Sequence, residues 1–339
     1  MENQPQPQTQ PQTLQSLTDD FGIPGVLEFT RRGDLLCLEI TAPALTASVT
    51  LHGAHLLSWQ PAGEAPVLFL SEQSEFTPGK AIRGGVPVIW PWFGPRTAIS
   101  PPPEGAPDSP SHGFVRTSVW RLQFAAVTAE AVHLSFTLAP SPESRALGFD
   151  GFRLAYQLIL GRDLTLRLTV ANDGPGDLQF EEALHTYFAV TEIEYVDLSG
   201  TEATEYLDKP DGMKRKRQPD AALAFTEVTD RVYLATEATC HINDTAGERT
   251  VHIAKSHSRN TVVWNPWAEL TAGLADMEPN AWHRMLCVET ANVGDAAVTL
   301  SPGAAHTVEA HITVSKTISR TAAGDGSIGV YSASLEDVP

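Results

Sequence analysis

The sequence predicts a mostly antiparallel, all-β fold, either a sandwich or a barrel. Apolar and polar residues alternate with a period of two in several stretches, which is typical of strands that bury one face. Turn sequences rich in Gly, Asn, Asp and Pro lie between these stretches. No window offers three or four turns of an amphipathic helix. Together these three observations indicate one large β domain.

The clearest strand pattern lies between residues 153 and 170. Large apolar side chains occupy every second position from 154 to 160 and again from 164 to 170. The tripeptide Gly161-Arg162-Asp163 separates the two runs, so the stretch predicts a hairpin with one buried face. The same alternation recurs at residues 132–138 and 308–314, which we predict to be further strands.

The two ends of the chain differ in composition from the middle. Gln and Pro dominate the first fifteen residues. Such a segment buries too little apolar surface to offset its ordering entropy, so we predict a disordered tail over residues 1–18. Ala, Gly and Ser predict a second tail over residues 317–339, which leaves a β-sandwich domain over residues 19–316. Five prolines between residues 100 and 111 predict an exposed loop.

Charge and composition exclude several classes of partner. The 339 residues include 23 Lys and Arg and 41 Asp and Glu, a formal net charge of -18. An acidic surface repels nucleic acids and anionic membranes, so we expect neither as a partner. No apolar run approaches the roughly 20 residues of a membrane-spanning helix, and the N-terminus does not resemble a signal peptide. Three widely separated cysteines, Cys37, Cys240 and Cys287, predict buried free thiols and a reducing cytoplasm.

The first candidate segment is residues 79–94, in which two glycines follow Arg83 and lead into Trp90-Pro91-Trp92-Phe93. Adjacent glycines allow unusual backbone angles and a close approach to a ligand. A guanidinium can hold a carboxylate or phosphate through two hydrogen bonds. Arg83 is therefore either an anion-binding residue or a surface arginine on a bulged strand.

Two histidines lie in segments that suggest a pocket. His112 and Arg116 lie on either side of Gly113, so a bend at this glycine would turn both side chains into one pocket; the alternative is a solvated loop. His185 lies within the β-like run of residues 181–188. It is either a hydrogen-bonded core residue or a general acid, because imidazole titrates near neutral pH.

Two carboxylates are also candidates. Glu289 ends an apolar run, where a carboxylate must be solvated, paired or functional. A desolvated Glu with a raised pKa is a competent base. Asp230 precedes Arg231-Val232-Tyr233 and either begins a strand or accepts a hydrogen bond from a polar ligand.

Other familiar motifs are missing from the sequence. The pairs His52/His55 and His252/His257 lack a nearby carboxylate at an established metal spacing, so we predict no metal site. No glycine-rich phosphate loop, dinucleotide fingerprint or Gly-x-Ser-x-Gly motif occurs. We interpret the basic run at residues 214–217 as a solvated loop.

Taken together, these segments resemble the hexose-6-phosphate mutarotase family, also called glucose-6-phosphate 1-epimerases, a branch of the aldose 1-epimerase superfamily. The resemblance extends from His52 to Val314. It is most specific over residues 81–94, 112–116, 184–188 and 287–289, whose order and separations also agree. Classical epimerases of unphosphorylated aldoses usually read His-Pro-Tyr-Phe where this chain reads His185-Thr186-Tyr187-Phe188, which favours the phosphate branch.

The resemblance implies a galactose-mutarotase-like β-supersandwich, with the sugar site on the concave face of a large sheet. It implies that His185 is the general acid and Glu289 the general base. The implied partner is a small-molecule sugar phosphate, and the implied protein is a monomer without a cofactor. The implied substrate-binding residues are Arg83 and Arg116 for the phosphate, and His112 and Asp230 for the sugar hydroxyls or ring oxygen.

The implied reaction is mutarotation by ring opening. Glu289 takes the proton of the C1 hydroxyl, protonated His185 donates to the ring oxygen, and the C1–O5 bond breaks. Rotation about C1–C2 then presents the other carbonyl face, and the reverse proton transfers close the ring as the opposite anomer. These steps require no metal, redox group or covalent intermediate.

Two alternatives stay open. One is an epimerase of unphosphorylated aldoses on the same scaffold. The other is a non-catalytic carbohydrate-binding protein that uses the tryptophan-rich stretches at residues 90–92 and 264–267. The presence of both His185 and Glu289 argues against a pure binder, which does not need an acid and a base matched to ring opening.

Overall fold

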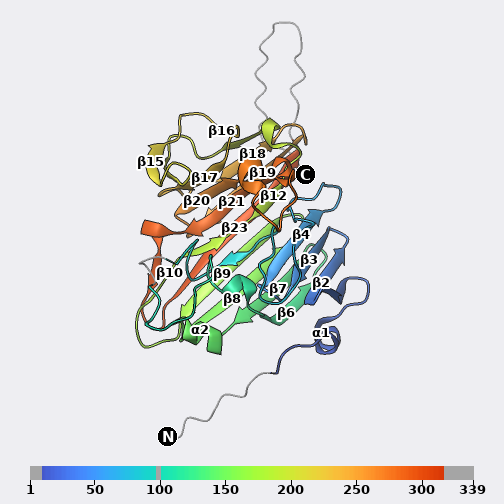
Figure 1. The fold of residues 1–339 in the computed structure, drawn as a ribbon. Coiled ribbons are helices and arrows are strands. Elements are labelled where there is room, and N and C mark those ends of the chain that lie inside the picture. The colour runs from blue at the N-terminus through green and yellow to red at the C-terminus, as the bar shows by residue number, and fades with distance from the viewer. Residues whose placement is uncertain (1–9, 97–100, 317–339) are drawn as a thin grey trace, which may run out of the picture.

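The computed structural model describes residues 10–96 and 101–316. Antiparallel sheets dominate this part of the chain, which confirms the predicted all-β fold (Figure 1). The predicted C-terminal tail, residues 317–339, lies outside the described residues.

The largest sheet among the described residues has nine strands. In chain order they are β6 (Arg121–Val127), β7 (Val132–Leu138), β8 (Phe152–Leu160), β9 (Leu164–Asn172), β13 (Val196–Ser199), β16 (Leu223–Ala224), β18 (Cys240–Asp244), β19 (Arg249–Ser256) and β23 (Ala305–Lys316). Their order in the sheet is β16-β13-β18-β19-β23-β9-β8-β7-β6. The long strand β23 crosses the middle of the molecule between β19 and β9 (Figure 1).

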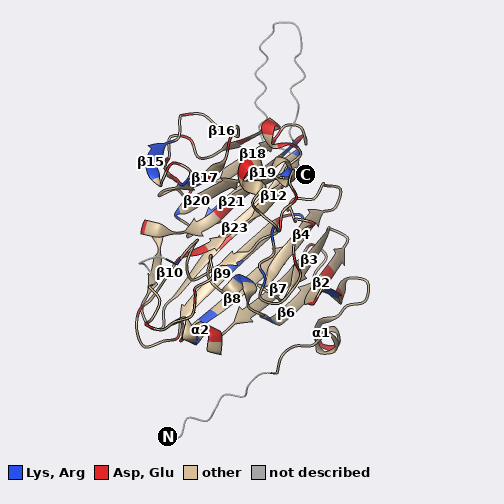
Figure 2. Cartoon of the chain, in the orientation of Figure 1, with Lys and Arg blue, Asp and Glu red and all other residues tan. Residues whose placement is uncertain are grey.

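A second sheet, of eight strands, carries most of the candidate residues. Its strands are β5 (Val88–Ile89), β11 (Glu182–Leu184), β12 (Tyr187–Ala189), β14 (Glu205–Asp208), β15 (Lys214–Arg217), β17 (Thr229–Tyr233), β20 (Asn260–Asn265) and β21 (Met285–Asn292). The order is β15-β14-β17-β20-β21-β11-β5, and β12 also pairs with β21. The basic run Lys214–Arg217, predicted as a solvated loop, is instead the exposed edge strand β15, where Lys and Arg gather in Figure 2.

Two smaller sheets contain the remaining strands of the described residues. The four-stranded sheet contains β1 (Leu27–Arg32), β2 (Leu35–Ala42), β3 (Leu45–Thr50) and β4 (His55–Pro61). The other pairs β10 (Leu178–Phe180) with β22 (Val298–Leu300). A continuous core of buried apolar side chains joins strands of the two large sheets and the four-stranded sheet.

The helices are short. They are α1 (Leu14–Phe21), α2 (Pro142–Ala146) and α3 (Trp267–Thr271), with 3-10 turns η1 (Val115–Thr117), η2 (Ile193–Tyr195), η3 (Ala281–Arg284) and η4 (Gly294–Ala296). In the part of the chain that the structure describes, no helix has the length and apolar character needed to cross a lipid bilayer.

The predicted hairpin is confirmed. Strands β8 and β9 pair from Phe152↔Asn172 to Leu160↔Leu164, and the apolar positions of both strands are buried. The intervening turn is tied to the four-stranded sheet, because the Trp59 indole donates to the Gly161 carbonyl over 3.1 Å. The strands predicted at residues 132–138 and 308–314 are also present, as β7 and within β23.

Helix α1 corrects the predicted N-terminal tail. The Thr13 and Ser16 side chains form a reciprocal capping box, which satisfies otherwise free backbone donors. Leu17 is fully buried, and the Gln12 side chain exchanges two hydrogen bonds with the backbone of Leu122. The prediction of a tail as far as residue 18 is therefore wrong for residues 14–18, because it weighed composition and overlooked the helix cap. Residues 1–9 lie outside the described residues.

Candidate active site

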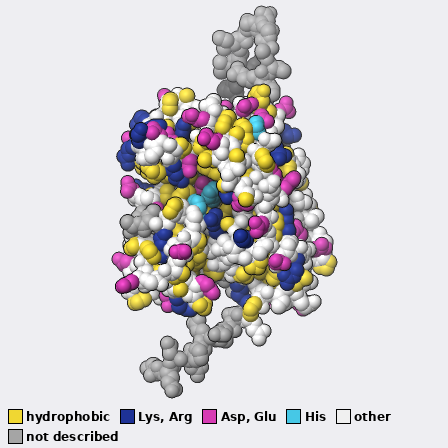
Figure 3. Space-filling model, in the orientation of Figure 1, with side chains coloured by type: hydrophobic (Ala, Val, Ile, Leu, Met, Phe, Trp, Pro, Cys, Tyr) yellow, Lys and Arg dark blue, Asp and Glu magenta, His cyan; other side chains and the backbone are white. Residues whose placement is uncertain are grey.

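A small pocket of about 160 Å³ lies on the eight-stranded sheet and brings together residues far apart in the sequence. Its lining residues are Arg83, Phe93, His112, His185, Tyr187, Lys209, Asp230, Trp264 and Glu289. Five of the six residues predicted from the sequence are among them; Arg116 is the exception. Histidine side chains with basic side chains beside them are visible near the centre of this face in Figure 3.

His185 and Glu289 are placed opposite each other by strand register. Leu184 pairs with Thr290 and Tyr187 with Cys287, so the same antiparallel register sets His185 opposite Glu289. The ladder is interrupted at His185 because the Thr186 N–H donates to the Leu184 carbonyl over 2.9 Å, a three-residue turn. The resulting distance from His185 Nε2 to Glu289 Oε1 is 3.3 Å.

Burial acts on both members of this pair. The Glu289 side chain is 1% exposed and that of His185 is 10% exposed. Burial raises the pKa of Glu289 well above its usual value. Burial, helped by the nearby His112 and the positive charges of Arg116 and Arg83, lowers the pKa of His185 well below its usual value. Burial therefore favours the neutral form of each group, the carboxylic acid of Glu289 and the neutral imidazole of His185.

One side-chain atom of each residue in the His185–Glu289 pair remains available for a hydrogen bond to a ligand. Among the described residues, Glu289 Oε2 and His185 Nδ1 have no hydrogen-bond partner. The His185 ring stacks on that of Tyr187, with ring centroids 4.9 Å apart and planes 12° apart. Stacking fixes the imidazole plane, while the free carboxylate oxygen of Glu289 can accept a proton or a hydrogen bond from a ligand.

His112 is held in a neutral, oriented form. Its backbone lies in the left-handed region, with φ at 63°, and its N–H donates to the Gly94 carbonyl over 2.7 Å. The Gly94 N–H donates in return to His112 Nδ1 over 3.2 Å, which assigns the ring proton to Nε2. Burial, with the charges of Arg116, Lys209 and Arg83, lowers the pKa of His112 to about 3. At neutral pH this imidazole is therefore a hydrogen-bond donor to the pocket.

Arg83 reaches the pocket from a segment shaped by two glycines. Gly85 has φ at 59°, and a Cβ atom there would lie 2.2 Å from the Leu56 carbonyl oxygen. His55 Nε2 donates to the Gly84 carbonyl over 2.7 Å. Gly85 thus permits close approach to strand β4, and Gly84 permits close approach to the backbone of Phe69 and Leu70, not to a ligand as the sequence suggested.

The Arg83 guanidinium is anchored on one side by the Asp276 carboxylate and the Tyr187 hydroxyl. Its Nε donates to the Asp276 carboxylate over 3.2 Å, and NH1 donates to the Tyr187 hydroxyl over 3.1 Å. A further contact of 3.1 Å joins NH2 to Asp276. The guanidinium has five N–H donors, so these contacts orient the fork and leave N–H groups available to an anion.

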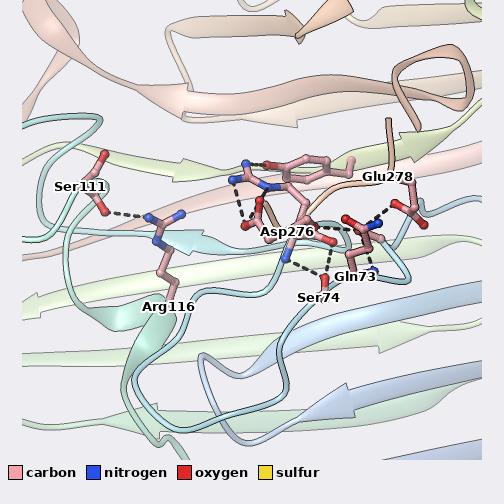
Figure 4. Close-up of polar contacts among 9 residues, drawn as sticks. Gln73, Ser74, Ser111, Arg116, Asp276 and Glu278 are labelled. Carbon is pink, nitrogen blue, oxygen red and sulfur yellow. Dashed lines mark hydrogen bonds and ion pairs between the residues drawn. The ribbon is translucent and has the colours of Figure 1, made fainter. Parts of the chain in front are cut away.

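Arg116 lies beside the pocket and does not line it. It belongs to turn η1, and its NH2 donates to the Ser111 carbonyl over 2.8 Å (Figure 4). Among the described residues it forms no ion pair. Its charge nevertheless acts on the site, since it lowers the pKa values of His112 and His185. Arg83 is balanced by Asp276, so Arg116 contributes an uncompensated positive charge here.

Asp230 enters the pocket from β17 and is paired with Lys209, a residue that was not predicted from the sequence. Lys209 Nζ lies 3.0 Å from Asp230 Oδ1. Burial raises the pKa of Asp230, and the Lys209 charge opposes this rise. Lys209 follows strand β14 and precedes Pro210-Asp211-Gly212, which reads locally as a solvated turn. No local pattern distinguishes it from other surface lysines.

Four further residues were not predicted as site residues, and one of them, Phe93, lines the pocket beside His112 and Lys209. Tyr187 stacks on His185 and contacts Arg83, Trp264 lies across the strand pair from Asp230, and Asp276 orients Arg83. Phe93, Tyr187 and Trp264 lie in stretches that are distinctive in the sequence, whereas Asp276 lies in the irregular stretch between α3 and η3 and carries no such signal. No group of three or more His, Cys, Asp or Glu side chains within the described ranges could hold a metal ion.

Comparison with known proteins places the chain beside sugar epimerases. The family profile described as aldose 1-epimerase matches residues 36–313. A protein of Escherichia coli K12 named "Putative glucose-6-phosphate 1-epimerase" is 36% identical over 281 residues, 83% of this chain and 91% of that protein. A protein of the same name from Cenchrus ciliaris is 30% identical over 266 residues, 76% of this chain and 78% of its own length.

Solved structures agree with this likeness. The crystal structure of a "putative mutarotase (YeaD)" from Salmonella typhimurium superposes on this chain with a TM-score of 0.78 at 34% sequence identity. The match covers 86% of this chain and 94% of that one. A crystal structure of HI1317 superposes with a TM-score of 0.71 at 27% identity and covers 96% of that chain.

Proposed function

The chain belongs to the aldose 1-epimerase family, and from this premise we propose that it is a hexose-6-phosphate 1-epimerase that interconverts the α and β anomers of glucose 6-phosphate or a related hexose 6-phosphate. The observation that carries the proposal is the 3.3 Å approach of His185 Nε2 to Glu289 Oε1 in a pocket whose other polar groups are basic or hydrogen-bonding. The names of the relatives support the choice of a phosphorylated sugar.

In this proposal Glu289 is the base and His185 the acid. The C1 hydroxyl and the ring oxygen are bonded to the same carbon, so the groups that serve them must lie close together, as this pair does. Glu289 accepts the proton of the C1 hydroxyl while His185 donates one to the ring oxygen, and the C1–O5 bond breaks. After rotation about C1–C2, His185 takes back its proton, Glu289 returns its own, and the ring closes as the other anomer.

The raised pKa of Glu289 and the lowered pKa of His185 suit this reversible exchange. A carboxylate with its usual pKa would be a weak base, and an imidazolium with its usual pKa would hold its proton more firmly. The raised pKa makes the Glu289 carboxylate a stronger base, and the lowered pKa makes the His185 imidazolium a stronger acid. The same pair can thus act as base and acid during opening and as acid and base during closure.

The phosphate is assigned to Arg83 and Arg116. Arg83 lines the pocket with a guanidinium oriented by Asp276 and Tyr187, which lowers the entropy cost of binding an anion. Arg116 adds the positive charge that no carboxylate among the described residues pairs with. His112 and Asp230 are assigned to the sugar, His112 as a donor from Nε2 and Asp230 as an acceptor for a hydroxyl.

The proposal extends to the setting of the enzyme. The three cysteines are buried and free, which suits a reducing cytoplasm. We propose a monomer that acts on a small sugar phosphate and binds no nucleic acid, in keeping with its net charge of -18.

Anomer exchange measured by NMR on glucose 6-phosphate and on glucose tests the substrate assignment. The proposal predicts that the enzyme accelerates exchange of the phosphorylated sugar by at least tenfold more than that of glucose at equal concentration, since one charge-assisted bond is worth about 1.5–3 kcal/mol. Equal acceleration of both sugars would instead identify an epimerase of unphosphorylated aldoses.

A further inference from the structure

Lys209 lies directly opposite Asp230 across a pair of strands. β14 and β17 pair with Tyr206 opposite Tyr233 and Asp208 opposite Arg231, so the next position of the same register sets Lys209 opposite Asp230. The Lys209 N–H donates to the Asp230 carbonyl over 3.0 Å, and Lys209 Nζ lies 3.0 Å from Asp230 Oδ1. Backbone and side chain both tie the two residues together.

The β14–β15 hairpin holds Lys209 in this place. The Met213 N–H donates to the Asp208 carbonyl over 2.8 Å, and the Gly212 N–H donates to the Lys209 carbonyl over 3.1 Å. Lys216 contacts Asp208 at 2.6 Å and Asp211 at 2.8 Å. The carboxylates on its own hairpin are therefore balanced by another lysine, and the Lys209 ammonium is left to the pocket.

Lys209 also lies where the pocket opens into a wider groove of about 670 Å³. It lines both cavities, together with Phe93, His112 and Asp230. Its Nζ is 4.8 Å from the centroid of the Phe93 ring, a cation–π contact that restrains the ammonium beside Asp230. A sugar in the pocket would therefore have this ammonium at one end.

The electrostatic surroundings show why a cation is needed here. Besides Asp208 on its own hairpin and Asp230, the charged or titratable groups that Lys209 meets along these cavities are Arg83, His112, Glu181, His185, Tyr187, Glu289 and Asp295. The half-buried Asp230 and the buried Glu289 are two acids in one small pocket, and the charge of Asp230 raises the pKa of Glu289 further. The Lys209 charge acts in the opposite direction on both carboxyl groups.

We propose that Lys209 is a positioning residue of the epimerase: it holds the Asp230 carboxylate toward the sugar and supplies the positive charge that balances Asp230 and Glu289. This inference rests on the proposed function, in which Asp230 accepts a sugar hydroxyl and Glu289 accepts the C1 proton. Lys209 acts through these two carboxylates and takes no proton in the reaction.

The first experiment compares Lys209→Met, Lys209→Arg and wild type by NMR anomer exchange across pH. Removing the charge should lower kcat/KM by about ten- to a hundredfold, the range for a hydrogen bond to a charged group. It should also move the acid limb of the pH profile to higher pH, because Glu289 loses a nearby cation and holds its proton more firmly. Lys209→Arg should keep the acid limb of the wild type.

Lys214→Met is the matched control. Lys214 lies on the same hairpin, is exposed, and pairs with Asp211 at 2.8 Å, away from the pocket. This variant should keep the rate and pH profile of the wild type. If Lys209→Met lowers kcat/KM but leaves the acid limb of its pH profile in place, Lys209 has only a structural role and the proposal is overturned.

A second measurement decides the matter without a sugar. Carbon-13 NMR of the Asp230 and Glu289 carboxyl groups, assigned with Asp230→Asn and Glu289→Gln, gives their titration midpoints directly. Both midpoints should be higher in Lys209→Met than in wild type or Lys209→Arg; unchanged midpoints would reject the proposal. If the wild type accelerates neither sugar, the proposed function fails, and this titration still decides the role of Lys209.

Discussion

His185 Nε2 lies 3.3 Å from Glu289 Oε1 because one strand register runs through a break in the β-ladder. A residue within a regular ladder would commit its backbone to the neighbouring strand. Here the turn at His185 bonds Thr186 N–H to Leu184 instead, and pairing resumes at Tyr187 without loss of register. The fold thereby sets an acid and a base opposite each other on rigid strands, although 104 positions separate them in the sequence.

A site of this kind should carry a cost in stability that depends on pH. The folded-state pKa of Glu289 is raised above its unfolded value by burial. The folded state thus binds the Glu289 proton more tightly than the unfolded state does. Proton binding by Glu289 therefore stabilises the folded state fully below pH 4.5, and this stabilisation is lost as pH rises through the folded pKa. Glu289→Gln mimics the protonated form, so it should raise the midpoint of urea unfolding at pH 8 and leave it unchanged near pH 4. A loss of stability at pH 8 would contradict the account.

Buried histidines should make the protein sensitive to acid. Burial lowers the pKa of both His55 and His112 to about 3, whereas their unfolded forms titrate near 6.5. Their lowered pKa values stabilise the folded state above pH 6.5, and this contribution is lost as pH falls from 6.5 toward 3. Urea unfolding should therefore show a steadily falling free energy over this range, and His55→Gln should show a shallower fall. A slope unaltered by that substitution would speak against a neutral, buried His55.

The anion assignment predicts a split between KM and kcat. Arg116→Ala should raise KM for glucose 6-phosphate by about ten- to a hundredfold, the equivalent of one charge-assisted hydrogen bond, with a smaller change in kcat. Exchange of glucose should be little affected. Arg162→Ala, in the exposed turn between β8 and β9, is the control for loss of one arginine and should match the wild type. A drop in kcat at constant KM would remove Arg116 from phosphate binding.

The position of His112 depends on the glycine that follows it. Gly113 has φ at 69°, and a Cβ atom there would lie 1.9 Å from the Trp90 carbonyl oxygen. Gly94 has a similar φ of 66°, with nothing within 4 Å of such an atom. Gly94→Ala should cost about 1–2 kcal/mol of unfolding free energy, the strain of a left-handed residue alone. Gly113→Ala should cost clearly more and displace His112, which urea unfolding and the exchange rate can report; equal costs would refute the close contact.

Much of the fold follows from patterns that are local in the sequence. Alternation at residues 153–170 predicts a hairpin because one face of each strand is buried, and β8 and β9 show that burial. Helix α1 was not predicted, because a capping box and one buried leucine are its only signals within a Gln- and Pro-rich stretch. The glycines after Arg83 indicated a close approach, but the local sequence does not reveal that Gly85 packs against strand β4 and Gly84 against the backbone at residues 69–70.

The site was harder to predict where a residue acts through a partner distant in the sequence. His185 and Glu289 carry their chemistry in their own residue types, and a family resemblance relates them. Lys209 and Asp276 read as ordinary surface residues until the fold sets them against Asp230 and Arg83. Arg116 shows the converse: its sequence position suggests a pocket residue, whereas its guanidinium is turned to the Ser111 carbonyl.

The central claim is that His185 and Glu289 form the acid–base pair of a hexose-6-phosphate epimerase, and NMR anomer exchange on glucose 6-phosphate tests it most directly. The comparison should include wild type, His185→Ala, Glu289→Gln and the control Glu182→Gln. Glu182 is a fully buried carboxylate on β11 that contacts His306 at 2.8 Å outside the pocket. The account predicts rapid exchange with the wild type and the control, and a loss of about 10²- to 10⁴-fold in each of the other two variants, all four being folded. Exchange by folded Glu289→Gln at the wild-type rate would contradict it.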